Sequence, residues 1–150
     1  MIDIKVEPWS ILTALDRGLC VRHWQEIAHH QDKIPLSPDW ERYRKMAEAG
    51  VIHLTTARDA GILVGYLVYF VVPHLHYSKS ITALSDVLYL APEYRLGTTG
   101  IRLLKVAEVS LRALGVQRVI QNVKVDHDWS PILLRQGYTL FERVYSKLLE

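Results

Sequence analysis

Cysteine, long apolar runs and an excess of one charge are all scarce in this chain of 150 residues. The single cysteine, Cys20, cannot form a disulfide within the chain, which excludes a disulfide-stapled scaffold and favours a reducing compartment. The longest apolar stretch, residues 62–73, is shorter than the about 20 residues that a membrane-spanning helix needs. No cationic start followed by an apolar run opens the sequence. We therefore expect a cytoplasmic protein without membrane contact.

The excess of positive over negative charge is small as well. The chain has 18 Lys and Arg against 16 Asp and Glu, and its formal net charge is +2. The basic residues are scattered, with small groups such as Arg42, Arg44 and Lys45, whereas nucleic-acid binders usually concentrate them on one face. We expect no nucleic-acid partner, although the slight excess could favour an anionic small ligand.

Length and composition indicate one folded domain over residues 1–150. The sequence is 49% hydrophobic and 23% charged, which is the composition of a globular protein rather than of a disordered one. A chain of this length can bury enough surface to form a core without a disulfide or a metal.

The periodicity of apolar residues predicts a mixed α/β domain. The predicted helices are residues 9–30 (one helix, or two broken near Gly18), 40–49, 99–114 and 130–136. The predicted strands are residues 51–58, 62–72, 81–90, 116–125 and 138–149, the last as one strand or a strand pair. Residues 73–80 are polar and are predicted to be a connection. Three consecutive strands followed by a strand, helix and strand indicate a sheet with an antiparallel start and a parallel crossover.

The segment between the third strand and the third helix is the strongest candidate for a binding site. A turn into a helix start presents backbone N–H groups that lack intrahelical acceptors and can hold a phosphate. Gly97 and Gly100 permit close approach of a ligand, Thr98 and Thr99 add hydroxyls, and Arg95 adds a positive charge. Neither the dinucleotide fingerprint nor the Walker lysine is present. The pattern predicts a pyrophosphate site of another type.

This segment resembles the coenzyme A loop of the GNAT superfamily of acetyltransferases, usually written R/Q-x-x-G-x-G/A. Here it runs Arg95-x-x-Thr98-x-Gly100, so Thr98 replaces the middle glycine. The later segment 133–138 looks like the Tyr-x-Lys-Leu-Gly-Phe signature of the same superfamily. The order of elements agrees from residue 51 onward, and the first two helices match by position only.

The resemblance implies a GNAT fold, in which a mixed, mostly antiparallel central sheet contains one parallel, splayed strand pair and is flanked by helices. It implies acetyl-CoA as cosubstrate, with no metal, and an acetyl group transferred directly to an amine of a small molecule or of a protein. The backbone of Leu88 and Leu90 would bind the pantetheine arm. The pyrophosphate would lie on the loop of Arg95, Leu96, Gly97, Thr98, Thr99 and Gly100.

The resemblance also makes Asp86, on the strand before the loop, the first candidate for the catalytic base; the structural alternative is an aspartate that binds nearby backbone. His76, which lies close to His74 and Tyr77, is a second candidate base, since an ordinary histidine titrates near neutral pH. Loop histidines without a role, or metal ligands, are the other interpretations of this pair. No further cluster of ligands supports a metal site.

The general acid is where this sequence departs from its relatives. Many members place a tyrosine four residues before the signature glycine, and that position is Leu133 here. Tyr89 and Tyr138 are the alternative acids, and buried core tyrosines are the plain interpretation of both. Asp126 stands where relatives often have an asparagine that reaches the cofactor, and its charge would not help there.

Two further expectations concern partners. The acceptor would enter beside the first two helices, where Trp40, Tyr43, His76 and Tyr77 could line the wall or simply pack. The apolar segment 140–149 could pair across a homodimer. A catalytically weak or inactive GNAT-like module that binds CoA is the alternative to the enzyme, and a nucleotide-binding regulator is a third possibility.

Overall fold

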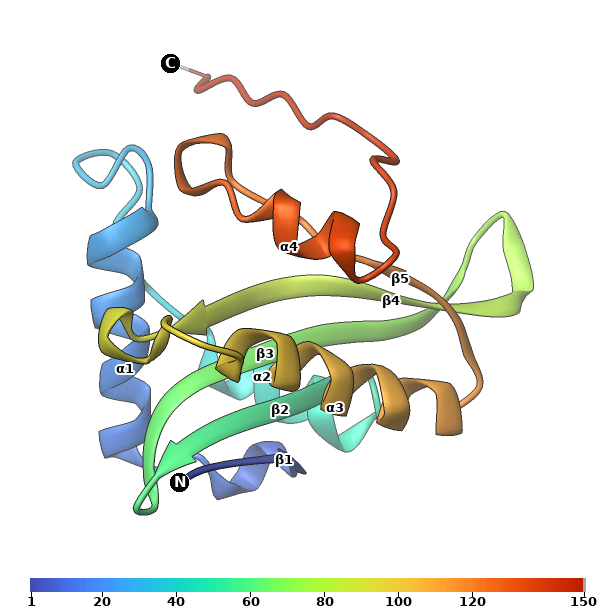
Figure 1. Ribbon diagram of the computed structural model, residues 1–150. Coiled ribbons are helices and arrows are strands. Elements are labelled where there is room, and N and C mark those ends of the chain that lie inside the picture. Colours follow the sequence, from blue (N-terminus) through green and yellow to red (C-terminus); the bar gives the residue numbers. More distant parts are fainter. Residues whose placement is uncertain (150) are drawn as a thin grey trace.

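The computed structural model describes residues 1–149 and contains one five-stranded sheet with the order β1-β2-β3-β4-β5. The strands are β1 (Ile2–Glu7), β2 (Ile52–Asp59), β3 (Ile62–His74), β4 (Tyr77–Leu90) and β5 (Val116–Ile120). The first four strands pair antiparallel with their neighbours, and β4 and β5 pair in parallel (Figure 1). This is the predicted fold class, with a crossover helix joining the two strands of the parallel pair.

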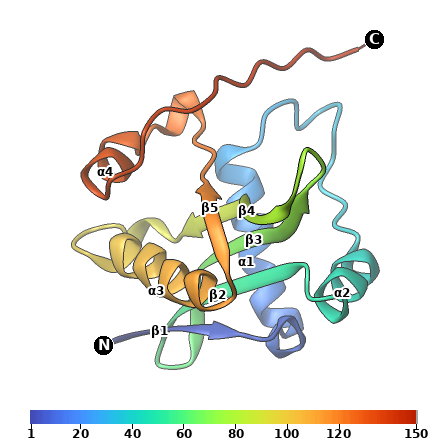
Figure 2. The same cartoon turned by 90° about the vertical axis from the view of Figure 1, so that its right-hand side faces the viewer.

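The helices cover both faces of the sheet (Figures 1 and 2). They are α1 (Ala14–Ile27), α2 (Trp40–Glu48), α3 (Thr99–Ala113) and α4 (Ser130–Arg135). Thr13 and Asp16 form a reciprocal capping box that begins α1, and the Asp39 side chain caps α2. Gly115, with a φ of 83°, follows α3 and allows the chain to turn into β5.

Two apolar clusters fill the space between the sheet and the helices. The larger one lies under α3 and includes Leu67, Tyr69, Leu103, Leu104 and Leu111, which are all almost fully buried. The smaller one lies on the opposite face, towards α1 and α2, and includes Leu54, Tyr66, Val68 and Tyr89. The sheet is therefore covered on both faces, which explains the near-continuous apolar run of β3. No helix among the described residues is long and apolar enough to cross a membrane.

Several element boundaries differ from the sequence prediction. Residues 2–7 form an edge strand that the prediction left out, although Ile2, Ile4 and Val6 alternate with charged residues as an edge strand requires. The first long helix starts at Ala14 and runs through Gly18 without a break. The predicted connection at residues 73–80 is wrong, because β3 and β4 continue through it and only a tight turn joins them.

The predicted last strand is also wrong for the single chain. Residues 138–149 have no regular secondary structure, and β5 ends at Ile120 rather than at residue 125. A strand needs a hydrogen-bonding partner, and this segment lies away from the sheet in both views (Figures 1 and 2). The apolar pattern that predicted a strand is real, but residues 138–149 add no strand to the sheet that the structure describes.

Candidate active site

The candidate site begins where β4 and β5 separate. Their register runs from the pair Ile81 and Val116 to the pair Leu84 and Ile120, and it ends there. One step later Ser85 closes the pairing with side-chain bonds: the Asn122 N–H donates to the Ser85 hydroxyl at 2.9 Å. Beyond Ser85, β4 continues to Leu90 paired with β3 alone. Its other edge has no strand partner among residues 1–149, as the splayed strand pair requires.

A β-bulge at Asp86 coincides with this separation. On β3, Val68 faces Val87 and Tyr69 faces Ser85, so Asp86 is the extra residue of β4. Such a bulge changes which face of the sheet the following side chains occupy. Ala83 packs in the cluster under α3, whereas Val87 and Tyr89 pack towards α1. Alternation from Ala83 already places Asp86 on the face opposite α3, and the bulge keeps Val87 and Tyr89 on that same face, towards α1.

Asp86 is held by a tyrosine of α2. The Tyr43 hydroxyl donates to Asp86 Oδ2 at 2.5 Å, and the Tyr43 ring stacks on Trp9 at a centroid distance of 4.7 Å. Burial raises the pKa of Asp86, and the Tyr43 hydrogen bond offsets part of that rise. A carboxylate whose pKa is raised towards neutrality is a better general base than an exposed aspartate. Tyr43 was expected only as part of the acceptor wall.

The loop between β4 and α3 has room for an anionic ligand. Gly97 has a φ of 85°, which favours glycine. The first N–H groups of the 15-residue helix α3 lack an intrahelical acceptor, and the Thr98 side chain before it does not cap them. Gly100 has an ordinary φ, and a Cβ placed on it would meet no atom within 4 Å. The fold does not itself require glycine there, so the space fits a pyrophosphate lying close to the backbone.

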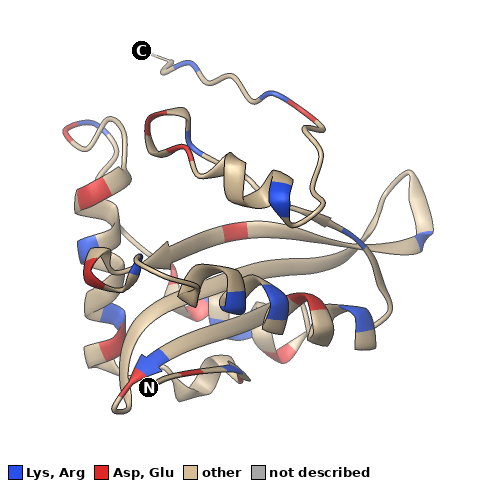
Figure 3. Ribbon diagram, viewed as in Figure 1, with Lys and Arg blue, Asp and Glu red and all other residues tan. Residues whose placement is uncertain are grey.

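Arg95 is already engaged by groups of the protein. Its Nε donates to the Leu90 carbonyl at 2.7 Å, and its Nη1 lies 2.6 Å from Glu26 Oε1 on α1. A second ion pair, between Arg22 and Glu93, joins the same helix to the same loop at 2.8 Å. Both signs of charge alternate along α1 in Figure 3. A pyrophosphate would therefore compete with Glu26 for Arg95.

The two candidate tyrosines lie on different faces of the sheet. Tyr89 is buried, its hydroxyl donates to Glu26 Oε2 at 2.8 Å, and burial together with this bond raises its pKa to about 12. Tyr138 packs with the cluster under α3, and its hydroxyl donates to Glu108 at 2.6 Å. Burial raises the pKa of Tyr138 above its ordinary value as well. Only Tyr89 lies on the free half of β4.

His76 and Leu133 lie away from Asp86. His76 is exposed in the turn between β3 and β4, ten positions before Asp86 and thus roughly 30 Å from it along the strand. The hairpin tip and the α3 start are at opposite ends of the sheet in Figure 1. Leu133 is 6% exposed and belongs to the core under α3. The structure does not bring either side chain together with Asp86.

A polar group on α1 was missed by the sequence analysis. His23 is buried, its Nδ1 lies 2.7 Å from the Tyr66 hydroxyl, and its ring stacks on Tyr89 at 4.6 Å. Burial lowers the pKa of His23 to about 4, so it is neutral near pH 7. The helix period alone would place His23 and Glu26 on one side of α1, one turn apart, but it does not reveal their partners.

The end of α1 also contacts the segment after β5. The Lys124 ammonium donates to the Ile27 carbonyl at 2.8 Å, and His29 lies 2.7 Å from Asp126. Asp126, which stands where relatives often have an asparagine, is thus paired with a histidine. Glu26, near the same end of α1, binds Arg95 in the loop after β4. Helix α1 therefore contacts the segments that follow both of the strands that separate at Ser85.

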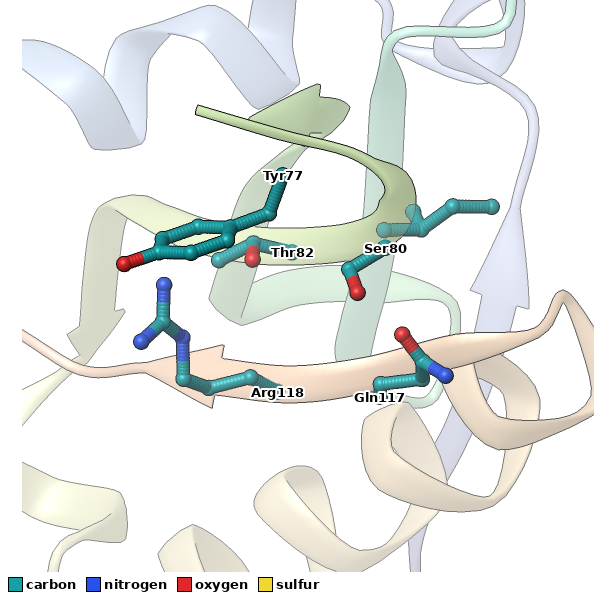
Figure 4. Close-up of a pocket in the computed structure, with 6 residues that line it drawn as sticks. Tyr77, Ser80, Thr82, Gln117 and Arg118 are labelled. Atoms are coloured by element: carbon teal, nitrogen blue, oxygen red, sulfur yellow. The ribbon is translucent and has the colours of Figure 1, made fainter. Parts of the chain in front are cut away.

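Two cavities are lined by residues of the helices and strands described above. One of about 620 Å³ lies between α1 and α2 and is lined by Trp9, Trp40, Arg17 and Glu41 among others. Trp9 joins it to the site, since the Trp9 ring stacks on Tyr43. The other, of about 270 Å³, lies between the starts of β4 and β5, where Figure 4 shows Tyr77 and Arg118 facing each other. This second cavity is at the hairpin end, away from Asp86.

Comparison with known proteins gives a fold but no closer relationship. No family model matches the chain, and no curated protein matches it. Among solved structures, an aminoglycoside acetyltransferase from an uncultured soil metagenomic sample is similar, with a TM-score of 0.76 and 14% identity over 100% of this chain and 99% of that one. A predicted acetyltransferase with acetyl-CoA from Clostridium acetobutylicum has a TM-score of 0.71 and 9% identity over 99% and 96%.

A third similar structure is described differently. It is a transcriptional regulator from Bacillus halodurans, with a TM-score of 0.78 and 15% identity over 99% of this chain and 100% of that one. At such identities the likeness shows the fold alone. The chain has the GNAT fold, and the expected fold class is confirmed.

Proposed function

We propose that this protein is an acetyl-CoA-dependent N-acetyltransferase that transfers an acetyl group directly to a primary amine of a small molecule or of a protein. The observation that carries the proposal is the position of Asp86. Its carboxylate, with a raised pKa, stands at the bulge where the free edge of β4 begins. A base beside an unpaired strand edge fits a reaction in which an extended ligand lies along that edge.

Acetyl-CoA would supply the activated acetyl thioester. The free edge of β4 offers the backbone of Leu88 and of Leu90 to the pantetheine arm, with the Leu90 carbonyl already bound by Arg95 Nε. The loop offers the N–H groups that start α3 to the pyrophosphate. The loop residues in this role are Arg95, Leu96, Gly97, Thr98, Thr99 and Gly100. The open space at Gly100 supports this placement.

Asp86 would accept the proton of the amine as its nitrogen attacks the thioester carbon, so that a C–N bond forms while the C–S bond breaks. Tyr43 would hold the carboxylate in place. The leaving thiolate needs a proton, and Tyr89 is our candidate donor because it lies on the same half of β4. A group placed to donate such a proton typically contributes about 10²- to 10⁴-fold in rate.

A small-molecule amine is the acceptor class to test first. The similar aminoglycoside acetyltransferase acts on a small molecule that carries amines, and a cavity lined by Trp9 and Trp40 adjoins the ring that holds Asp86. Protein amines remain within the proposal, since an exposed amine has the same chemistry.

The alternative is a GNAT-like module that binds CoA with weak activity or none. Two observations favour it: Leu133 lies in the core at the position of the usual tyrosine, and Glu26 occupies Arg95. Calorimetry with acetyl-CoA and CoA, followed by a thiol-release assay on a panel of amines, separates the two. Binding with turnover supports the enzyme, whereas binding without turnover on any amine favours the module.

A further inference from the structure

A buried histidine of α1, His23, has no part in the proposed function. Its side chain is only 8% exposed. The ring stacks on Tyr89 at a centroid distance of 4.6 Å, and Nδ1 lies 2.7 Å from the Tyr66 hydroxyl. Tyr66 of β3 and Tyr89 of β4 are direct cross-strand partners, with ring centroids 6.1 Å apart. The imidazole therefore contacts a pair of tyrosines on adjacent strands.

Packing alone does not account for a histidine at this position. Burial is the main reason that the pKa of His23 is lowered to about 4, so the ring is neutral near pH 7. Burying an imidazole takes a polar ring out of water, which an apolar side chain of similar size would not do. The buried Tyr66 hydroxyl pairs with Nδ1 and offsets part of this cost. The same hydrogen bond fixes the plane of the imidazole.

The hydroxyl of Tyr89 is held from the same side of α1. Glu26 follows His23 by three residues, so the two side chains are neighbours on the helix surface. The Tyr89 hydroxyl donates to Glu26 Oε2 at 2.8 Å, and Glu26 Oε1 lies 2.6 Å from Arg95 Nη1. The Arg95 guanidinium is also 5.4 Å from the centre of the Tyr89 ring. Helix α1 thus contacts the ring of Tyr89 through His23 and its hydroxyl through Glu26.

We propose that His23 is a positioning residue that holds the Tyr89 ring, so that the Tyr89 hydroxyl stays on Glu26 at the free half of β4. The inference rests on the proposed function, in which Tyr89 is the candidate proton donor to the leaving thiolate. A stacked neighbour limits the rotamers that a tyrosine ring can adopt. This restraint matters because Leu133, buried in the core under α3, does not supply the usual tyrosine.

The direct test is the NMR signal of the Tyr89 Cζ carbon, which responds to the hydrogen bond of the hydroxyl. It is recorded near neutral pH on the full-length protein with labelled tyrosine, and Y89F assigns it. H23N removes the stacked ring but keeps a side chain that can bond Tyr66, and it should move the signal. H23F/Y66F brings back a ring without an unpaired hydroxyl and should return the signal towards its wild-type position. An unmoved signal in H23N, or a signal that H23F/Y66F fails to return, would overturn the proposal.

Turnover separates a positioning role from a merely structural one. H23N should lower kcat about tenfold and leave the affinity for acetyl-CoA within about twofold. In the Y89F background H23N should lower kcat no further, because the side chain that it positions is already inactive. H53N is the matched control: His53 is a buried histidine bonded to Ser110 of α3 at 2.9 Å, and its loss should lower stability without lowering kcat. Equal losses of kcat in H23N and H53N, or equal losses with and without the Tyr89 hydroxyl, would contradict the proposal.

The NMR signal does not depend on turnover, so the positioning role and the proposed function can fail separately. A Tyr89 signal that moves in H23N, in a protein that acetylates no amine, would support the role of His23 and contradict the proposed function. An unmoved signal in a protein that does acetylate amines would support the proposed function and remove His23 from it.

Discussion

The two halves of β4 have the same strand conformation and different surroundings. From Ile81 to Leu84 the strand is paired on both edges, with β3 and with β5. From Asp86 to Leu90 it is paired with β3 alone, and the bulge at Asp86 marks the change. The first half lies inside the sheet between β3 and β5. The second half carries the candidate base and leads into the loop before α3.

The difference shows how a sheet can supply a site without losing its core. Backbone pairing on one edge keeps the free half of β4 in place, and the other edge is left for a ligand. Polar contacts then fix the side chains of this half: Tyr43 binds Asp86, Glu26 binds Tyr89, and Arg95 binds the Leu90 carbonyl. Changes in the paired half should therefore affect stability, and changes in the free half should affect binding and turnover.

The largest expected effect comes from D86N. Removing the base at the start of the free half should lower kcat/KM by about 10²- to 10⁴-fold, because asparagine cannot accept the proton of the amine. Thermal unfolding and acetyl-CoA affinity should change little. D3N is the matched control, since Asp3 lies exposed on the opposite edge strand, and its activity should equal that of the wild type. Retained activity of D86N would remove Asp86 from the mechanism.

Two glycines separate the contributions of sheet packing and ligand space. A Cβ on Gly65 of β3 would lie 2.7 Å from the Leu90 side chain, so G65A should lower the free energy of unfolding by about 1–3 kcal/mol. G100A meets no atom of the protein and should keep or slightly raise stability, but it should weaken acetyl-CoA binding by about tenfold. Chemical denaturation and calorimetry measure the two effects. Unchanged affinity in G100A would contradict the ligand placement.

A smaller effect is expected for E26Q. The variant removes the carboxylate that competes for Arg95 while keeping a partner for the Tyr89 hydroxyl. Because both side chains are partly exposed, we expect acetyl-CoA to bind only about two- to fivefold more tightly. E41Q, which breaks a pair with Arg44 on α2, serves as control and should leave the affinity unchanged. Weaker binding by E26Q would mean that Glu26 helps to form the site.

The smallest change is expected in the pH profile of Y43F. The Tyr43 hydroxyl stabilises the Asp86 carboxylate, so its loss should raise the pKa of Asp86 further. The low-pH limb of kcat/KM should then move upward by up to about one pH unit, with turnover at higher pH little changed. Y77F, at the exposed hairpin tip, should leave the limb in place. An unmoved limb in Y43F would show that Tyr43 does not act through Asp86.

Much of the fold could be predicted from the sequence because its signals are local. The loop glycines, the long apolar strand and the helix before Gly115 each follow from turn chemistry or periodicity. The edge strand at residues 2–7 was missed although its alternation was visible. The extension of the β3–β4 hairpin was hidden by the polar residues 73–80, since an exposed hairpin needs no apolar pattern to pair.

The site was harder to predict than the fold. Asp86 and the loop follow from position in the chain, but the contacts that define their chemistry join distant residues. Tyr43 and Asp86 are 43 residues apart, and His29 and Asp126 are 97 apart. The bulge itself depends on the register of two strands and has no signature in one of them. Neither the pairing of Glu26 with Arg95 nor the lack of regular structure in residues 138–149 could be derived from spacing.

The most direct test of the division of β4 is an NMR titration of the isotope-labelled protein with acetyl-CoA, following the backbone amides. The account predicts saturable shifts at Asp86–Leu90 and at residues 95–100, with little change at Ile81–Leu84. Absence of binding, or shifts concentrated in the paired half at the hairpin end, would contradict the claim that the free half of β4 is the cofactor edge.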